Sequence, residues 1–281
     1  MAPRIGLVTD SSSQITADLV GRYAIEVVPL TVTIDGIDHL EGVDLDADGF
    51  YDRYAAGATP EVATSQPAPA RFADAYRRLA DRGIDEIVSV HISASMSGTV
   101  GSATVAAADA PVPVTVIDTG SASFGVTVCA WAAGVAIERG ANVEDIRRRI
   151  DTLVPRIATA FMIGVPALTE RGGRADGIDL EADEGIPVLV LERGELRVLE
   201  RVTTPADTID VMSTYVTGWG SDVTVAIGTA DEPSRPLTSK LAEALDGAAS
   251  VTDVVHYRVG PSVGAHTGPG TFGLFVFPTI R

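Results

Sequence analysis

An apolar, strand-like segment leads directly into a hydroxyl-rich turn in the N-terminal half of the chain. Ile87–His91 is the apolar segment, and the turn after it carries Ser93, Ser95 and Ser97 before a helical pattern begins. Hydroxyl groups and free backbone N–H groups at a helix N-terminus are donors that suit an anion. Capping of the helix by Ser95 or Ser97 explains the same residues without a ligand. The segment therefore predicts either an anion site or a simple helix cap.

Three other segments place polar side chains where a ligand could meet them. Asp10–Ser13 follows the first strand-like segment, so it lies at the carboxyl edge of the same sheet, where open α/β folds bind ligands. Thr64–Pro69 is a second hydroxyl-bearing turn before a helix, and capping is again an alternative. His266 stands among the glycines and prolines of residues 264–270, which predict a constrained loop. A histidine held in such a loop is a candidate binding residue.

Three catalytic or metal-binding motifs match in letters but not in context. Gly260–Gly264 matches a nucleophile elbow, which needs a helix directly after it, and the glycines and prolines of residues 264–270 predict that no helix follows. Gly268–Gly273 matches a dinucleotide fingerprint but leads into a strand instead of a helix. Asp44–Gly49 begins like a calcium loop, yet Ala55 stands where the bidentate glutamate belongs. The four histidines show no metal-ligand spacing, so neither a metal nor a cofactor is expected.

The charge balance and the rare residue types exclude several classes of protein. The chain has 281 residues, of which 21 are basic and 38 acidic, so its net charge is −17. Nucleic acid and anionic membranes attract a basic surface and are not expected as partners. Lys240 is the single lysine and follows no glycine-rich turn, which excludes a P-loop and argues against autonomous phosphoryl transfer. Cys129 is the single cysteine, which excludes an internal disulfide and a zinc site built on cysteines.

The apolar segments predict a protein without a membrane anchor. The most apolar one, residues 124–137, is too short to span a bilayer and is interrupted by Gly125 and Gly134. Met1–Arg4 runs directly into a strand-like segment, so no signal peptide is expected. We therefore expect a cytoplasmic protein with no transmembrane segment.

Alternating strand and helix patterns predict an α/β fold in the N-terminal half, with a mostly parallel sheet covered by helices on both faces. The expected strands are Ile5–Val8, Ile25–Leu30, Ile84–His91 and Val114–Asp118. The expected helices are Thr16–Tyr23, Asp48–Ala56, Pro69–Arg82, Gly98–Ala108, Ser121–Arg139 and Val143–Val154. Asp35-Gly36 predicts a tight hairpin between Thr31–Ile34 and Ile37–Leu40, since these residue types favour positive φ angles.

The C-terminal half mixes strands, a hairpin and helices, which predicts a second α/β domain with a mixed sheet. The expected strands are Ile157–Gly164, Pro187–Leu191, Leu196–Val202, Asp222–Gly228, Ser250–Arg258 and Thr271–Phe277. The expected helices are Pro205–Trp219 and Ser234–Leu245, and residues 170–185 are expected to be irregular. We place the domain boundary near Pro155, which divides the chain into residues 1–155 and 156–281.

Six short motifs occur in order along nearly the whole chain and together carry a resemblance. They are Thr9–Ser12, Val28–Leu30, Thr64–Pro67, Ile92–Thr99, Gly172–Arg174 and His266–Gly270. In this combination the chain resembles the DegV family of bacterial fatty-acid-binding proteins. The resemblance implies a two-domain α/β protein that holds one long-chain fatty acid between its domains. It also implies a role similar to that of the lipid-carrying subunit of a bacterial fatty acid kinase. That subunit presents the carboxylate to a separate ATP-dependent kinase, which forms an acyl-phosphate.

The resemblance assigns the head-group contacts to specific positions of this chain. The family's carboxylate-binding threonine, serine and histidine correspond to Thr64, Ser93 and His266. Where the family has a second serine, this chain has Ala94, whose backbone N–H is still a donor. Ser95 could supply the missing hydroxyl. No residue is expected to act as a catalyst.

Two further residues are expected near this site. Ser97 is a possible supporting donor in the serine-rich turn. Arg174 follows Gly172-Gly173, and the resemblance places it at the ligand entrance or at the kinase interface. Here Ala175-Asp176 replace the family's apolar residue and serine, a departure from the pattern.

Alternatives stay open at this point. The DegV fold is related to that of the substrate domains of dihydroxyacetone kinases, so a phosphotransfer subunit that holds its substrate on His266 is a second reading. A regulatory protein whose lipid is only a structural filler is a third. For the tail of a fatty acid, the apolar segments Ser121–Arg139 and Ile157–Ile163 are candidate pocket walls, and ordinary core packing explains them equally well.

Overall fold

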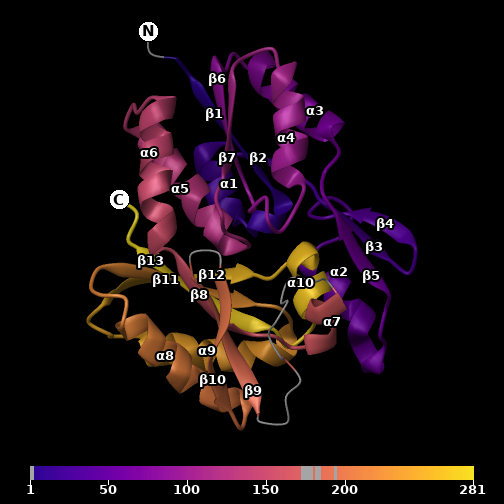
Figure 1. The fold of residues 1–281 in the computed structure, drawn as a ribbon, viewed down its shortest axis with the longest axis vertical. Helices are drawn as coiled ribbons and strands as arrows, with labels where there is room; N and C mark the ends of the chain where they lie inside the picture. The colour runs from indigo at the N-terminus through magenta and orange to yellow at the C-terminus, as the bar shows by residue number, and fades with distance from the viewer. Residues whose placement is uncertain (1–2, 172–179, 181–184, 193–194) are drawn as a thin grey trace.

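A four-stranded parallel sheet with the strand order β2-β1-β6-β7 organises the N-terminal part of the chain (Figure 1). The computed structural model describes residues 3–171, 180, 185–192 and 195–281. The strands of this sheet are β1 (Ile5–Asp10), β2 (Glu26–Val28), β6 (Glu86–His91) and β7 (Val114–Asp118). The short apolar segments between helices predicted this sheet, because parallel strands need crossover connections.

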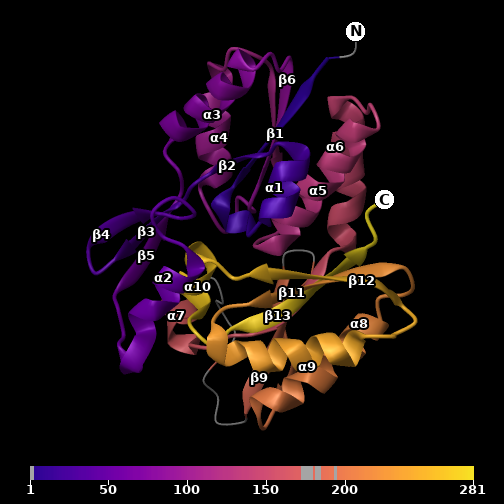
Figure 2. The same cartoon turned by 180° about the vertical axis from the view of Figure 1, so that it is seen from behind.

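Helices cover both faces of the parallel sheet (Figure 1, Figure 2). They are α1 (Ala17–Tyr23), α3 (Pro69–Asp81), α4 (Thr99–Ala108), α5 (Phe124–Glu138) and α6 (Val143–Leu153). On one face, Phe72 and Tyr76 of α3 pack with Ala103 of α4 over Val8 and Ile87. Helices α1, α5 and α6 lie on the other face, and the doubly covered sheet predicted from the sequence is confirmed.

A small antiparallel sheet of order β4-β3-β5 projects from the side of the N-terminal part. It consists of β3 (Thr31–Ile34), β4 (Ile37–Leu40) and β5 (Val62–Ser65), and the short helix α2 (Ala47–Tyr51) lies close by. Asp35 and Gly36 have φ angles of 50° and 79°, so the predicted hairpin is confirmed. Thr64 and Ser65 were expected in a turn but lie in β5, where they pair with Val32 and Thr31.

A six-stranded mixed sheet of order β10-β9-β8-β13-β11-β12 forms the C-terminal part. Its strands are β8 (Ala158–Met162), β9 (Ile186–Glu192), β10 (Glu195–Val202), β11 (Val223–Thr229), β12 (Val251–Arg258) and β13 (Phe272–Pro278). The helices of this part are α7 (Pro166–Arg171), α8 (Thr208–Thr217), α9 (Arg235–Leu245) and α10 (Pro261–Thr267). The two-domain α/β fold is thereby confirmed, and the proposed division at residues 155/156 falls between the two main sheets.

Helix α5 is enclosed between the parallel sheet and the mixed sheet. Twelve of its 15 residues are buried, and apolar side chains occur all around it. Val126 and Cys129 belong to the same buried cluster as Val90 of the parallel sheet and Phe275 of the mixed sheet. A helix that is apolar all round must be covered on every side, which explains why this segment is the most apolar of the chain.

Strand alternation gives the mixed sheet one core face and one face toward the N-terminal part. Ala158, Ala160 and Met162 of β8 join the core under α8 and α9. Thr159 and Phe161 of the same strand point to the opposite face, since successive side chains of a strand alternate. That second face is available to line a space between the two parts.

His266 lies on helix α10, where the sequence predicted a loop. The prediction that no helix follows Gly260 is wrong, and local chemistry explains why. Pro261 occupies the first helical turn, where its missing N–H is not needed, and Gly268 with φ 77° ends the helix. Gly264 allows close packing, because a Cβ atom there would lie 2.6 Å from the hydroxyl oxygen of Tyr51. Glycine and proline therefore bound and pack this helix instead of preventing it.

Candidate functional site

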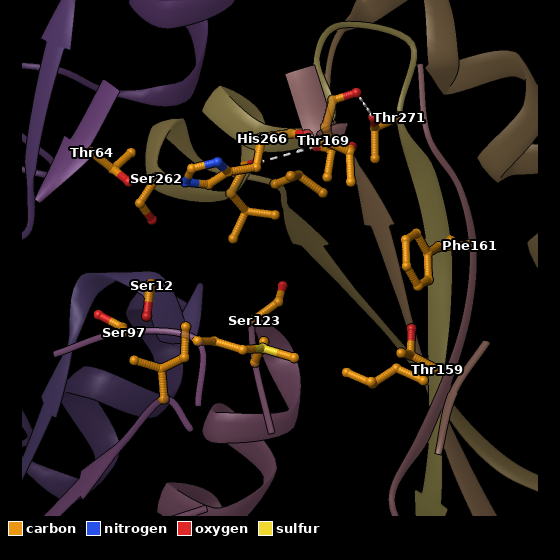
Figure 3. Close-up of a pocket in the computed structure, with 18 of the residues that line it drawn as sticks. Ser12, Thr64, Ser97, Ser123, Thr159, Phe161, Thr169, Ser262, His266 and Thr271 are labelled. Carbon is orange, nitrogen blue, oxygen red and sulfur yellow. Dashed lines mark hydrogen bonds between the residues drawn. The ribbon is translucent and has the colours of Figure 1, made fainter. Parts of the chain in front are cut away.

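A cavity of about 340 Å³ lies between the two parts of the chain (Figure 3). The parallel sheet contributes residues that follow its strands: Ser12 after β1, Leu30 after β2, Ser97 after β6 and Ser123 after β7. All four lie at the carboxyl edge, because the strands are parallel. The cavity therefore occupies the edge at which open α/β sheets bind ligands.

The opposite wall comes from the mixed sheet and from the helices beside it. Its apolar members are Phe161, Ile163, Leu191, Leu196, Val259, Val263, Phe272 and Phe275. Figure 3 shows Phe161 and Thr159 away from the cluster formed by Thr64, Ser262 and His266. The hydroxyl of Thr159 donates to the Leu274 carbonyl at 2.7 Å, so this polar group is already satisfied within the sheet. The cavity thus has a polar end and a mainly apolar end.

Thr64 and His266 meet at the polar end of the cavity. Thr64 Oγ1 lies 2.9 Å from His266 Nε2, so one of the two atoms donates to the other. The pairing of β5 with β3 holds Thr64 in place. His266 lies in the last turn of α10, and its backbone carbonyl accepts the Thr169 hydroxyl at 2.6 Å. Both side chains line the cavity. The structure thus brings together two of the residues predicted to bind a head group.

The other predicted residues of the serine-rich turn have different surroundings. Ser97 lines the cavity, and its hydroxyl lies 2.8 Å from Thr99 Oγ1. Ser93 is buried, and its hydroxyl lies 2.8 Å from that of Ser95. The backbone N–H of Ala94 donates to Asp118 Oδ2 at 3.2 Å. Of these residues, Ser97 is the one that forms part of the cavity wall, and head-group contacts by Ser93, Ala94 and Ser95 stay predictions.

Ser262 is a cavity residue that the sequence did not identify. It is buried, and it precedes His266 by four residues on α10, so both side chains lie on the same face of the helix. The residue has the strand–turn–helix context that the sequence was expected to lack. Its hydroxyl accepts the Gln14 side-chain amide at 3.4 Å, and His266 is paired with Thr64. If residues 261–267 had been predicted as a helix, the four-residue spacing would have placed Ser262 on the same face as His266.

Ser12 connects the cavity to a buried chain of polar groups. Its hydroxyl donates to Asp10 Oδ1, and Asp10 Oδ2 lies 2.8 Å from His91 Nδ1. On the other side of the ring, His91 Nε2 lies 2.6 Å from Ser89 Oγ, which in turn lies 3.0 Å from the Tyr76 hydroxyl. The Tyr76 hydroxyl comes from α3, and all the other groups come from β1, β6 or the turn after β1. These hydrogen bonds satisfy the side chains of Asp10 and His91 inside the core.

The described cavity wall is nearly free of charge. Among the lining residues that the structure describes, none is a lysine, arginine, aspartate or glutamate. Burial raises the pKa of the Tyr257 hydroxyl, so this lining residue stays neutral. The polar end therefore offers neutral hydroxyl groups and one histidine to a ligand.

Other expectations concern parts of the chain away from this cavity. Gly172, Gly173 and Arg174 lie outside the described residues. No group of three or more potential metal ligands occurs among the residues that the structure describes. Within the same residues, no helix combines the length and the apolar character needed to cross a membrane. Lys240 is exposed on α9.

Comparison with known proteins identifies relatives over nearly the whole chain. A family model described as "Uncharacterised protein, DegV family" matches residues 4–279. A DegV domain-containing protein from Streptomyces coelicolor is 34% identical over 282 residues, which cover 98% of this chain and 99% of that protein. Another from Mycobacterium tuberculosis is 33% identical, with 96% of each chain covered.

Solved structures show the same fold. One, described as showing fatty acid binding of a DegV family protein from Thermus thermophilus, is 30% identical and covers 98% of this chain and 100% of that chain, with a TM-score of 0.89. A DegV lipid-binding protein from Thermotoga maritima is 25% identical, with 99% of each chain covered and a TM-score of 0.85. The sequence and the fold agree over nearly the whole chain, and the chain belongs to the DegV family.

Proposed function

We propose that this chain binds a long-chain fatty acid in the cavity and presents its carboxylate to a separate ATP-dependent kinase. The observation that carries the proposal is the Thr64–His266 pair at the polar end of a mainly apolar cavity. The carboxylate would lie among Thr64, Ser97, Ser262 and His266, with the alkyl chain directed toward Phe161. The Thermus thermophilus relative, described as binding fatty acid, supports this choice of ligand.

The apolar end of the cavity suits the tail of such a ligand. Palmitate has about 14 methylene groups, and burial of each contributes ~0.8 kcal/mol, which sums to roughly 11 kcal/mol before association costs. Tail burial can therefore supply most of the affinity. The head group then needs only enough donors to avoid an unpaired buried carboxylate, and hydroxyl groups suffice.

Neutral donors also suit a carboxylate that must react. An arginine clamp would hold the carboxylate charge in a bidentate ion pair and make its oxygens poorer nucleophiles. The hydroxyl-lined end of this cavity leaves a carboxylate oxygen available to attack the γ-phosphorus of ATP held by the kinase. The new oxygen–phosphorus bond forms as the bond from the γ-phosphorus to the bridging oxygen breaks, and ADP leaves. The single lysine, Lys240, is exposed and follows no glycine-rich turn, which supports a separate source of ATP chemistry.

Mass spectrometry of the purified chain tests the ligand. We expect native spectra to show a bound mass of about 250–280 Da, the range of common fatty acids, which organic extraction releases as free acid. A chain that stays lipid-free after incubation with palmitate and oleate would contradict the proposal. Turnover of ATP by the isolated chain would instead favour a phosphotransfer subunit that uses His266.

The contribution of the serine-rich turn needs its own test. Ser93 and the backbone N–H of Ala94 remain part of the proposed head-group site, with Ser95 as a supporting hydroxyl. We expect Ser93→Ala to reduce both lipid retention and phosphorylation by an added kinase. If Ser93→Ala leaves both unchanged, the head group is bound by Thr64, His266 and their neighbours alone.

A further inference from the structure

Glu41 is a buried carboxylate that joins the two parts of the chain behind the polar end of the cavity. It follows β4, and its exposed fraction is 6%. Its Oε2 accepts the Ser11 hydroxyl at 2.5 Å, and its Oε1 accepts the backbone N–H of Ser262 at 2.9 Å. Ser11 belongs to the turn after β1, whereas Ser262 belongs to α10, so one carboxylate binds both sides of the interface.

Gln14 makes a second contact to the start of the same helix. Its Oε1 accepts the backbone N–H of Gly260, and its Nε2 lies 3.4 Å from Ser262 Oγ. Pro261 has no N–H, so Gly260 and Ser262 provide the first backbone donors at this end of α10. Both donors are therefore satisfied by side chains of the N-terminal part. Gln14 holds its position with a φ of 58°, a conformation that non-glycine residues rarely adopt.

Helix α10 transmits this anchoring to the head-group site. The helix has seven residues, and Ser262 and His266 lie on one face of it. A short helix moves as a unit, so the position of its first turn sets where His266 Nε2 lies relative to Thr64 Oγ1. The partner strand β5 is tied to β3, which is continuous with the segment that carries Glu41.

We propose that Glu41 is a positioning residue for the head-group site: by holding the first turn of α10 against the N-terminal part, it places His266 on Thr64. This inference rests on the proposed function, because it concerns the same site. Glu41 itself does not line the cavity among the residues that the structure describes. It acts through Ser262 and the helix.

The energetic cost of a buried carboxylate supports a specific role for Glu41. Burial raises its pKa, and the hydrogen bonds from Ser11 and Ser262 oppose that effect. The partners that the structure describes for Glu41 are neutral hydroxyl and N–H groups. A side chain that only filled space would be more stable as an apolar residue, since burying a polar group costs free energy unless it is hydrogen-bonded. Glu41 instead provides two acceptor oxygens, one for the Ser11 hydroxyl and one for the Ser262 N–H.

The test compares Glu41→Leu with Glu41→Gln. Leucine removes both acceptors and leaves the Ser262 N–H unpaired, whereas glutamine keeps one acceptor for it. We expect Glu41→Leu to bind palmitate at least tenfold more weakly and Glu41→Gln to recover most of the affinity. Asp38→Asn, an exposed acid of the same hairpin, is the matched control and should bind as the wild type does.

A spectroscopic readout separates positioning from general stability. The ring ¹⁵N signals of His266 report its hydrogen bond to Thr64, so we expect them to shift in Glu41→Leu and to return toward wild-type values in Glu41→Gln. Unchanged His266 signals, or weakened folding with unchanged palmitate affinity, would overturn the proposal. If Glu41→Leu does not fold, Glu41→Asp replaces it, because its shorter side chain cannot reach Ser11 and Ser262 together.

Failure of fatty acid binding and failure of the role of Glu41 give different results in these measurements. A wild-type chain that binds no fatty acid removes the proposed ligand, yet the His266 signals of the variants still report whether Glu41 positions α10. Conversely, if the wild type and Glu41→Leu bind palmitate equally well, the proposed role of Glu41 is wrong and the proposed function stands.

Discussion

The Thr64 hydroxyl oxygen lies 2.9 Å from Nε2 of His266, although 202 residues separate the two in the chain. Thr64 stands at the side sheet of the N-terminal part, and His266 on a helix of the C-terminal part. Their contact exists only when the two parts pack together. The proposed head-group site is therefore a property of the interface and not of either part.

We expect Thr64→Val to weaken fatty acid binding by about 10- to 100-fold, the effect of one lost hydrogen bond to a charged group. Valine keeps the shape of threonine but removes the hydroxyl that pairs with His266. Titration of each variant with a fluorescent fatty acid measures the change. Thr33→Val on the neighbouring strand β3 is the control, since its hydroxyl contacts Asp38 away from the cavity. Equal affinities of the two variants would exclude Thr64 from the head-group site.

We expect His91→Phe to destabilise the fold by about 3–5 kcal/mol, because it leaves Asp10 buried with one donor fewer. His91 is fully buried between Asp10 and Ser89. Urea unfolding followed by circular dichroism measures the change. The exposed His256 provides the control, and His256→Phe should alter stability by less than about 0.5 kcal/mol. If His91→Phe loses as little stability as His256→Phe, the buried hydrogen bonds of His91 contribute little to the free energy of unfolding.

Cys129 gives the fold a specific sensitivity to alkaline pH. Burial in α5 raises the pKa of its thiol to about 12, whereas the thiol of an unfolded chain has a pKa of about 8.5. Above the lower value the unfolded chain loses the proton and the folded chain retains it, so the free energy of unfolding falls as pH rises. Between about pH 7 and about pH 10 this contributes a loss on the order of 2 kcal/mol.

Replacement of the thiol tests this pH dependence. We expect Cys129→Ala to lose less stability than the wild type over the same alkaline range, even if its stability at neutral pH is lower. Urea unfolding at the two pH values measures the difference. Tyrosines such as Tyr76 are common to both proteins, so their contributions to the pH dependence cancel in the comparison. Parallel losses in the two proteins would show that the thiol is not the responsible group.

Phe161 is expected to limit the length of the bound acyl chain. Its ring lies on the cavity face of β8, and its removal opens space at the apolar end. We expect Phe161→Ala to favour arachidate over palmitate relative to the wild type, measured by competition between the two acids. Met162→Ala removes the next side chain on the opposite face, so it should reduce stability without changing that preference. A preference that moves equally in both variants would contradict this role.

The sequence patterns predicted most of the elements because those patterns record local requirements. Short apolar segments, alternating with helical patterns in the N-terminal half, identified the strands of the two main sheets. Asp35-Gly36 identified the hairpin through its positive φ angles. The same local reasoning failed at α10. Gly264 is unfavourable in an isolated helix, but here it allows contact with Tyr51, which lies far away in the sequence. Local propensity could not include that contact.

The sequence by itself determined the α/β class, the family and the residue types available for a head group, since periodicity and ordered motifs are properties of the chain. The tertiary structure decided which of these residues meet. It paired Thr64 with His266, added Ser262 to the cavity wall, and gave Ser93 a hydroxyl partner in Ser95. The reason is physical: these contacts depend on how two sheets pack about α5, and packing between distant segments leaves no local pattern in the sequence.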